Sequence, residues 1–91
     1  MKIAILGTGS QAVSVARRIH QHEVVFGSCE SSADLTRWLA ASTGRSIRVV
    51  SPQEAVGEAQ VVLLAAAEDE LARLVAAAGS FTGKFVLQAG S

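Results

Sequence analysis

Apolar residues in this chain follow two alternating patterns. Continuous apolar runs, typical of strands covered on both faces, occur at residues 3–6, 23–27, 47–50, 60–65 and 84–88. Between these runs, apolar residues recur at intervals of three and four, which predicts amphipathic helices. Strands that alternate with helices through short links favour right-handed crossovers. We therefore expect an α/β fold with a doubly wound parallel sheet of about five strands in the order 3-2-1-4-5.

Capping residues mark where the predicted helices begin. The S-x-x-D motif at residues 31–34 predicts that the second helix is capped by Ser31, and Ser51 followed by Pro52 predicts the start of the third. In the second helix, Leu35, Trp38 and Leu39 form one apolar stripe. We expect this stripe, Trp38 included, to pack inward against the sheet.

A glycine-rich turn follows the first predicted strand directly. Its residues are Gly7, Thr8, Gly9, Ser10, Gln11 and Ala12. The first glycine allows a sharp turn, and the second lets a pyrophosphate approach the N–H groups at the helix start. Alanine is an accepted residue at the third position, where the helix packs on the strand. In this context the turn predicts a Rossmann-like, dinucleotide-binding fold, although a mononucleotide, an S-adenosylmethionine-type ligand or a purely structural turn remain alternatives.

Composition restricts the function classes and partners further. The 91 residues suit a single small domain, here taken as a dinucleotide-binding domain over residues 1–91 that lacks the rest of a longer enzyme. A net charge of +0 without a basic run argues against a nucleic-acid partner. No apolar stretch has the length of a membrane span or signal peptide, and one cysteine allows no internal disulfide. We expect a cytoplasmic protein.

The segment after the second strand is expected to contact the adenosine ribose. An acidic residue there binds the 2′-hydroxyl of NAD, whereas cations bind the 2′-phosphate of NADP. Ser28, Cys29, Glu30 and Ser31 occupy this segment, and serine hydroxyls could donate to a phosphate. Glu30 fits a ribose contact and a solvated carboxylate equally well, so these residues leave NAD and NADP open.

The loop after the fourth strand completes the predicted crevice. Ala65, Ala66, Ala67 and Glu68 are expected to approach the nicotinamide end, although Glu68 also suits the positive end of a helix dipole. We assign no catalytic residue and no metal ligand. Cys29 is expected to be a small loop residue, and His20 and His22 are expected to lie far from the crevice.

Four segments together resemble one known family. Residues 1–9, 25–28, 59–65 and 82–87 are similar to the N-terminal domain of the coenzyme F420-dependent NADP oxidoreductases. The resemblance implies that the glycine turn holds the pyrophosphate and that hydride passes directly between a deazaflavin and the nicotinamide. It also favours NADP, which the family binds through a Ser-Arg pair after the second strand. Cys29 stands here in place of that arginine.

Two other functions and one partner interaction follow from the same residues. The chain could be a nucleotide-binding sensor or assembly module without catalysis, or a Rossmann-like domain that has lost its ligand. In each case the fifth strand lies at a sheet edge. We expect this edge to be covered by a homo-oligomer contact or by a further C-terminal domain.

Overall fold

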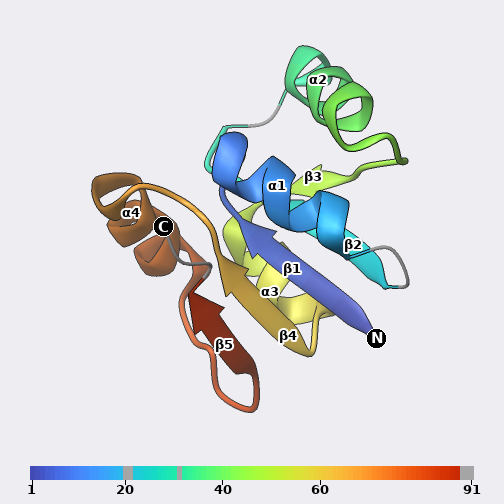
Figure 1. Ribbon diagram of the computed structural model, residues 1–91. Helices are drawn as coiled ribbons and strands as arrows, with labels where there is room; N and C mark the ends of the chain where they lie inside the picture. Colours follow the sequence, from blue (N-terminus) through green and yellow to red (C-terminus); the bar gives the residue numbers. More distant parts are fainter. Residues whose placement is uncertain (20–21, 31, 89–91) are drawn as a thin grey trace.

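The computed structural model describes residues 1–19, 22–30 and 32–88 and contains a single five-stranded sheet. The strands are β1 (Lys2–Leu6), β2 (Glu23–Gly27), β3 (Val49–Val50), β4 (Val61–Leu64) and β5 (Phe85–Gln88). They are all parallel and lie in the order β3-β2-β1-β4-β5 (Figure 1). The predicted α/β, Rossmann-like fold and its strand order are confirmed.

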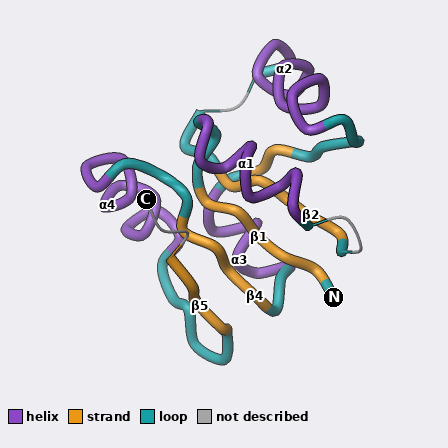
Figure 2. Tube along the Cα trace, viewed as in Figure 1, coloured by secondary structure: helices purple, strands orange, loops and turns teal. Residues whose placement is uncertain are grey.

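Four helices cover the two faces of this sheet in pairs. Helices α1 (Ser10–Arg18) and α2 (Ala33–Thr43) pack on one face, and α3 (Pro52–Glu58) and α4 (Glu68–Ala78) pack on the other (Figures 1 and 2). Because successive side chains of a strand point to opposite faces, the apolar side chains of β1 contribute alternately to the two cores. Ile3 and Ile5 contribute to the α1 side, while Ala4 and Leu6 contribute to the α3 side.

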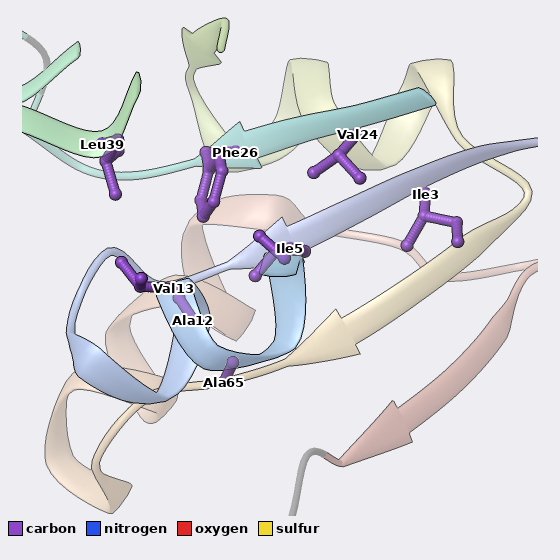
Figure 3. Packing of buried hydrophobic residues seen from close by; sticks show 9 residues of the cluster. Ile3, Ile5, Ala12, Val13, Val24, Phe26, Leu39 and Ala65 are labelled. Carbon is purple, nitrogen blue, oxygen red and sulfur yellow. The ribbon is translucent and has the colours of Figure 1, made fainter. Parts of the chain in front are cut away.

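The core on the α1 side fixes the end of β1. Ile5, Phe26 and Leu39 are fully buried there, beside Ala12 and Ala65 (Figure 3). Burial of each large side chain contributes roughly 1.5–3 kcal/mol relative to exposure. Because Ala12 and Ala65 belong to this cluster, the turn after β1 and the loop after β4 are held against each other.

Two predicted boundaries differ from the structure. Helix α2 is capped by Ser32 rather than by Ser31, which lies outside the described residues; the Ser32 hydroxyl accepts a hydrogen bond from the Leu35 N–H at 3.1 Å. A capping oxygen reaches the N–H three residues ahead, so Ser32 matches a helix that begins at Ala33. The third strand is shorter than the apolar run 47–50, because its ladder with β2 pairs only Val49 and Val50.

The predicted inward packing of Trp38 is wrong. Its side chain is 50% exposed, whereas Leu39 is fully buried and Leu35 is partly buried. These two leucines face the sheet, and Trp38 lines an open hollow between α1 and α2 together with Val13 and Arg17. Trp38 therefore lies at the border of the apolar stripe of α2 and faces this hollow rather than the sheet.

Strand β5 forms an apolar edge of the sheet. The side chains of Phe85, Val86 and Leu87 are 75%, 38% and 56% exposed. Phe85 and Leu87 pair in register with Val61 and Leu63 of β4, whose side chains pack in the core on the α1 side. Phe85 and Leu87 therefore lie on the same face of the sheet. None of the helices in the described ranges has the length and apolar composition of a membrane crossing.

Charged side chains join β1 to α3 at the sheet end opposite the glycine turn. The Glu58 carboxylate accepts hydrogen bonds from Arg48 at 2.8 Å and from Lys2 at 3.0 Å. These two cations, Arg48 first, hold the pKa of Glu58 at about 2, below its ordinary value of 4.5. A carboxylate whose pKa is lowered by folding stabilises the fold above its unfolded pKa, and this contribution is lost as the pH falls.

A Glu58→Gln variant is therefore expected to remove a pH-dependent part of the stability. Wild type should be the more stable protein above pH 4.5, and its advantage should shrink as the pH falls toward about 2. Thermal unfolding of both proteins across this range measures the difference. A difference in melting temperature between the two proteins that stays constant over this pH range would show that Glu58 makes no such contribution.

Candidate functional site

The turn after β1 contains a backbone position that only glycine fits. Gly7 has φ +126°, and a Cβ built on it would lie 2.2 Å from the carbonyl oxygen of Ala65. The Gly7 N–H donates to the Gly27 carbonyl at 3.1 Å, and the Ala65 N–H donates to the Leu6 carbonyl at 3.0 Å. The turn is thus fixed between the ends of β2 and β4, at the point where the strand order reverses.

Gly9 leaves open space in front of the first turn of α1. A Cβ added at Gly9 would meet no atom within 4 Å, and the residue itself is exposed. Gly9 is the N-cap of α1, and no side chain caps this helix end. The first N–H groups of a helix lack partners within the helix and bind anions readily. The space beside Gly9 can therefore admit an anionic group.

The N-terminus of α1 differs from those of the other described helices. Helices α2 and α3 are capped by Ser32 and Ser51, and each has an acidic residue in its first turn. Helix α4 has acidic residues at all of positions 68–70. The first turn of α1 holds neither a side-chain cap nor an acidic residue. Among these helices, α1 is therefore the one whose positive dipole end is available to an external anion.

A shallow hollow of about 310 Å³ lies between this helix start and the loop after β4. We call it the turn hollow; it is lined by residues 9–11, by residues 65–67 and by Glu70. Small side chains form most of its walls, so backbone groups lie close to its surface. The hollow brings together the predicted pyrophosphate turn and the predicted nicotinamide loop.

A second, smaller cavity of about 110 Å³ lies beside the end of β2. We call it the ribose cavity, after the contact predicted for its loop; it is lined by Thr8, by residues 28–30, and by Glu70, Arg73 and Leu74 of α4. The loop is held in place by two hydrogen bonds. The Ser28 N–H donates to the Val50 carbonyl at 3.0 Å, and the Glu30 N–H donates to the Ser28 hydroxyl at 3.1 Å.

Most residues predicted for the site lie on these two concave surfaces. Thr8, Ser28, Cys29 and Glu30 line the ribose cavity; Gly9, Ser10, Gln11 and Ala65–Ala67 line the turn hollow. Gly7 and Ala12 are buried beneath them. Glu68 is exposed at the start of α4 and lines neither surface, and Ser31 lies outside the described residues.

Helix α4 adds three residues that the sequence interpretation did not include. Glu70, Arg73 and Leu74 line the ribose cavity, and Glu70 also lines the turn hollow. Their i, i+3, i+4 spacing places them on one side of the helix. That spacing is visible in the sequence, but it does not show that this side meets the loop after β2.

Other reactive side chains lie apart from one another. Within the described residues, no group of three or more His, Cys, Asp or Glu side chains could hold a metal ion. His22 precedes β2 and is exposed, while His20 lies outside the described residues. Cys29 is an exposed free thiol on the rim of the ribose cavity. The polar side chains that line the ribose cavity are thus hydroxyl, thiol, carboxylate and guanidinium groups.

Comparisons with known proteins identify relatives by sequence and by fold. The family described as NADP oxidoreductase coenzyme F420-dependent matches residues 2–90. No match was found among curated proteins.

Two solved structures share the fold. The chain is similar to a protein described as an F420-dependent NADP-reductase from Arthrobacter sp. FB24, with 23% identity and a TM-score of 0.75. It is also similar to an imine reductase of Streptomyces aurantiacus, with 17% identity and a TM-score of 0.68. Each match covers 97% of this chain, but only 44% and 31% of those longer chains.

Proposed function

Since the chain belongs to the family of coenzyme F420-dependent NADP oxidoreductases, we propose that residues 1–91 form its domain for binding a nicotinamide dinucleotide. The observation that carries this proposal is the open, uncapped start of α1 beside Gly9. A pyrophosphate is the anionic group that a glycine turn after the first strand of this fold accommodates. Both concave surfaces then extend from the pyrophosphate along the ends of the strands.

The residues of the turn hollow would orient the cofactor. The start of α1 at Ser10 would lie beside the bound anion, and the small side chains of Ala65–Ala67 would leave room for a flat ring beside the end of β4. A bound nicotinamide supplies hydride chemistry at its ring. Direct hydride transfer depends mainly on how this ring is placed and needs no protein acid or base. This fits a site in which we assign no catalytic residue.

The proposed reaction class is hydride transfer to or from the nicotinamide, with a deazaflavin as the second redox partner. This part rests on family membership. The chain spans less than half the length of the two solved relatives, so the second substrate's site is proposed to involve polypeptide beyond residues 1–91.

Equilibrium titration tests the proposal. NADH and NADPH are each added to the chain while the fluorescence of the reduced nicotinamide is followed, and inorganic pyrophosphate is used as a competitor. We expect saturable binding of at least one dinucleotide and its displacement by pyrophosphate. No binding at millimolar concentration would instead favour a domain that has lost its ligand. Ligand-dependent association without hydride transfer would favour a sensor or assembly module.

We further propose that the exposed β5 edge takes part in self-association or is covered by further polypeptide. Unpaired strand edges with apolar side chains readily pair with other chains. A Phe85→Lys variant is expected to weaken self-association about tenfold or more, since burial of one phenylalanine contributes about 1.5–3 kcal/mol. Sedimentation velocity over a range of concentrations measures this change.

A control for this variant is Trp38→Lys, which removes another exposed large side chain, from α2 rather than from the edge. It should leave association unchanged. Wild-type protein that stays strictly monomeric at high concentration would contradict self-association through this edge and would leave coverage by further polypeptide as the role of the edge.

A further inference from the structure

The ribose cavity has a negative balance of charge. Three side chains that are charged at neutral pH line it, namely the carboxylates of Glu30 and Glu70 and the guanidinium of Arg73. Two negative groups and one positive group give a formal charge of −1. Among the described residues, no ion pair or side-chain hydrogen bond engages these three groups. They therefore remain available to a ligand in the cavity.

Two backbone N–H groups in the described part of the loop after β2 already have partners within the protein. The Glu30 N–H already donates to the Ser28 hydroxyl at 3.1 Å, and the Ser28 N–H already donates to the Val50 carbonyl at 3.0 Å. A bound phosphate depends on such N–H donors together with cations. With both N–H groups engaged within the protein, Arg73 is the cation that remains on the cavity wall.

Resting on the proposed function, we infer that Glu30 accepts the hydroxyl hydrogens of the adenosine ribose and that the chain selects NAD over NADP. A ribose with free 2′- and 3′-hydroxyls presents two neighbouring donors, and a carboxylate presents two acceptor oxygens. This selectivity departs from the NADP in the name of the family.

A 2′-phosphate would meet repulsion in the same place. It carries a charge of about −1.5 to −2 at neutral pH and would lie beside the existing formal charge of −1 on the cavity wall. Among the described residues, Arg73 is the one positively charged side chain on the cavity wall, and two carboxylates line the same wall. The Glu30 carboxylate therefore offers acceptor oxygens that a diol satisfies and a phosphate does not.

Isothermal titration of the full chain with NADH and with NADPH tests this inference. We expect the Kd of NADPH to exceed the Kd of NADH by a factor of about ten or more. This ratio corresponds to the free energy of one hydrogen bond with a charged group. A Glu30→Gln variant should narrow the ratio, because glutamine keeps one acceptor oxygen but removes the charge. Glu23→Gln is the matched control; it removes one negative charge at the opposite end of β2 and should leave the ratio unchanged.

Two results would overturn the inference while leaving the proposed function intact. One is wild-type binding of NADPH as tightly as NADH or more tightly. The other is a Glu30→Gln variant that binds both cofactors with the wild-type ratio while its circular dichroism shows an unchanged fold. Binding of neither dinucleotide to wild type would overturn the proposed function and this inference with it.

Discussion

Replacing Gly7 with alanine is expected to lower the free energy of unfolding by about 2–6 kcal/mol. The φ of +126° at this residue is costly for a residue with a Cβ, by about 1–3 kcal/mol. The added Cβ would also lie 2.2 Å from the Ala65 carbonyl oxygen, and overpacking of this kind adds roughly 1–3 kcal/mol. Urea unfolding of the variant measures the change.

Gly57→Ala supplies the control for this experiment. Gly57 lies within α3, and a Cβ there would meet no atom within 4 Å. Alanine in a helix interior is more favourable than glycine by roughly 0.5–1 kcal/mol, so this variant should be slightly stabilised. Equal unfolding midpoints for Gly7→Ala and wild type would show that the turn after β1 is not fixed against the loop after β4.

Replacing Gly9 with valine is expected to weaken dinucleotide binding strongly and to change stability little, in contrast to Gly7→Ala, whose main effect is on stability. The Cβ of the new side chain would lie in open space, with no atom within 4 Å, so we expect little strain in the free protein. Valine is a poorer N-cap than glycine, which costs about 1 kcal/mol at most. The side chain would occupy the place proposed for the pyrophosphate and would remove the proposed contacts with the N–H groups of α1. Loss of one charge-assisted hydrogen bond weakens binding by about tenfold to a hundredfold.

Isothermal titration with NADH, alongside thermal unfolding of the free variant, separates these two effects. A Gly9→Val protein that binds NADH like wild type would place the pyrophosphate elsewhere. A variant that binds weakly only because it is unfolded would show a loss of melting temperature comparable to that of Gly7→Ala. Together, the two glycine variants distinguish the residue that fixes the turn from the residue that admits the ligand.

The sequence was sufficient to predict the order of strands, because that order depends on local patterns and on a general rule of handedness. Each apolar run marked a strand, and each i, i+3, i+4 stripe marked a helix. The sharp turn at Gly7 could also be predicted, since its spacing follows from how a strand enters a helix. These features need no knowledge of which distant residues meet.

What could not be predicted depends on contacts between elements. Trp38 and Leu39 are adjacent and both apolar, but only the packing of α2 beside α1 determines which of them faces the sheet. Likewise, Glu70 and Arg73 line the ribose cavity because α4 lies across it from the loop after β2, although the two segments are about forty residues apart. The sequence pattern placed the predicted ribose contacts on the loop after β2 alone, whereas residues of α4 also line the cavity beside this loop.

The central claim is that a nicotinamide dinucleotide binds with its pyrophosphate at the start of α1. A titration of isotopically labelled chain with NADH, followed amide by amide in nuclear magnetic resonance spectra, tests it most directly. We predict that the largest saturable shifts occur at the N–H groups of Gly9, Ser10 and Gln11, with further shifts along residues 28–30 and 65–67. Spectra that do not change at millimolar NADH, or shifts confined to other surfaces, would contradict the claim.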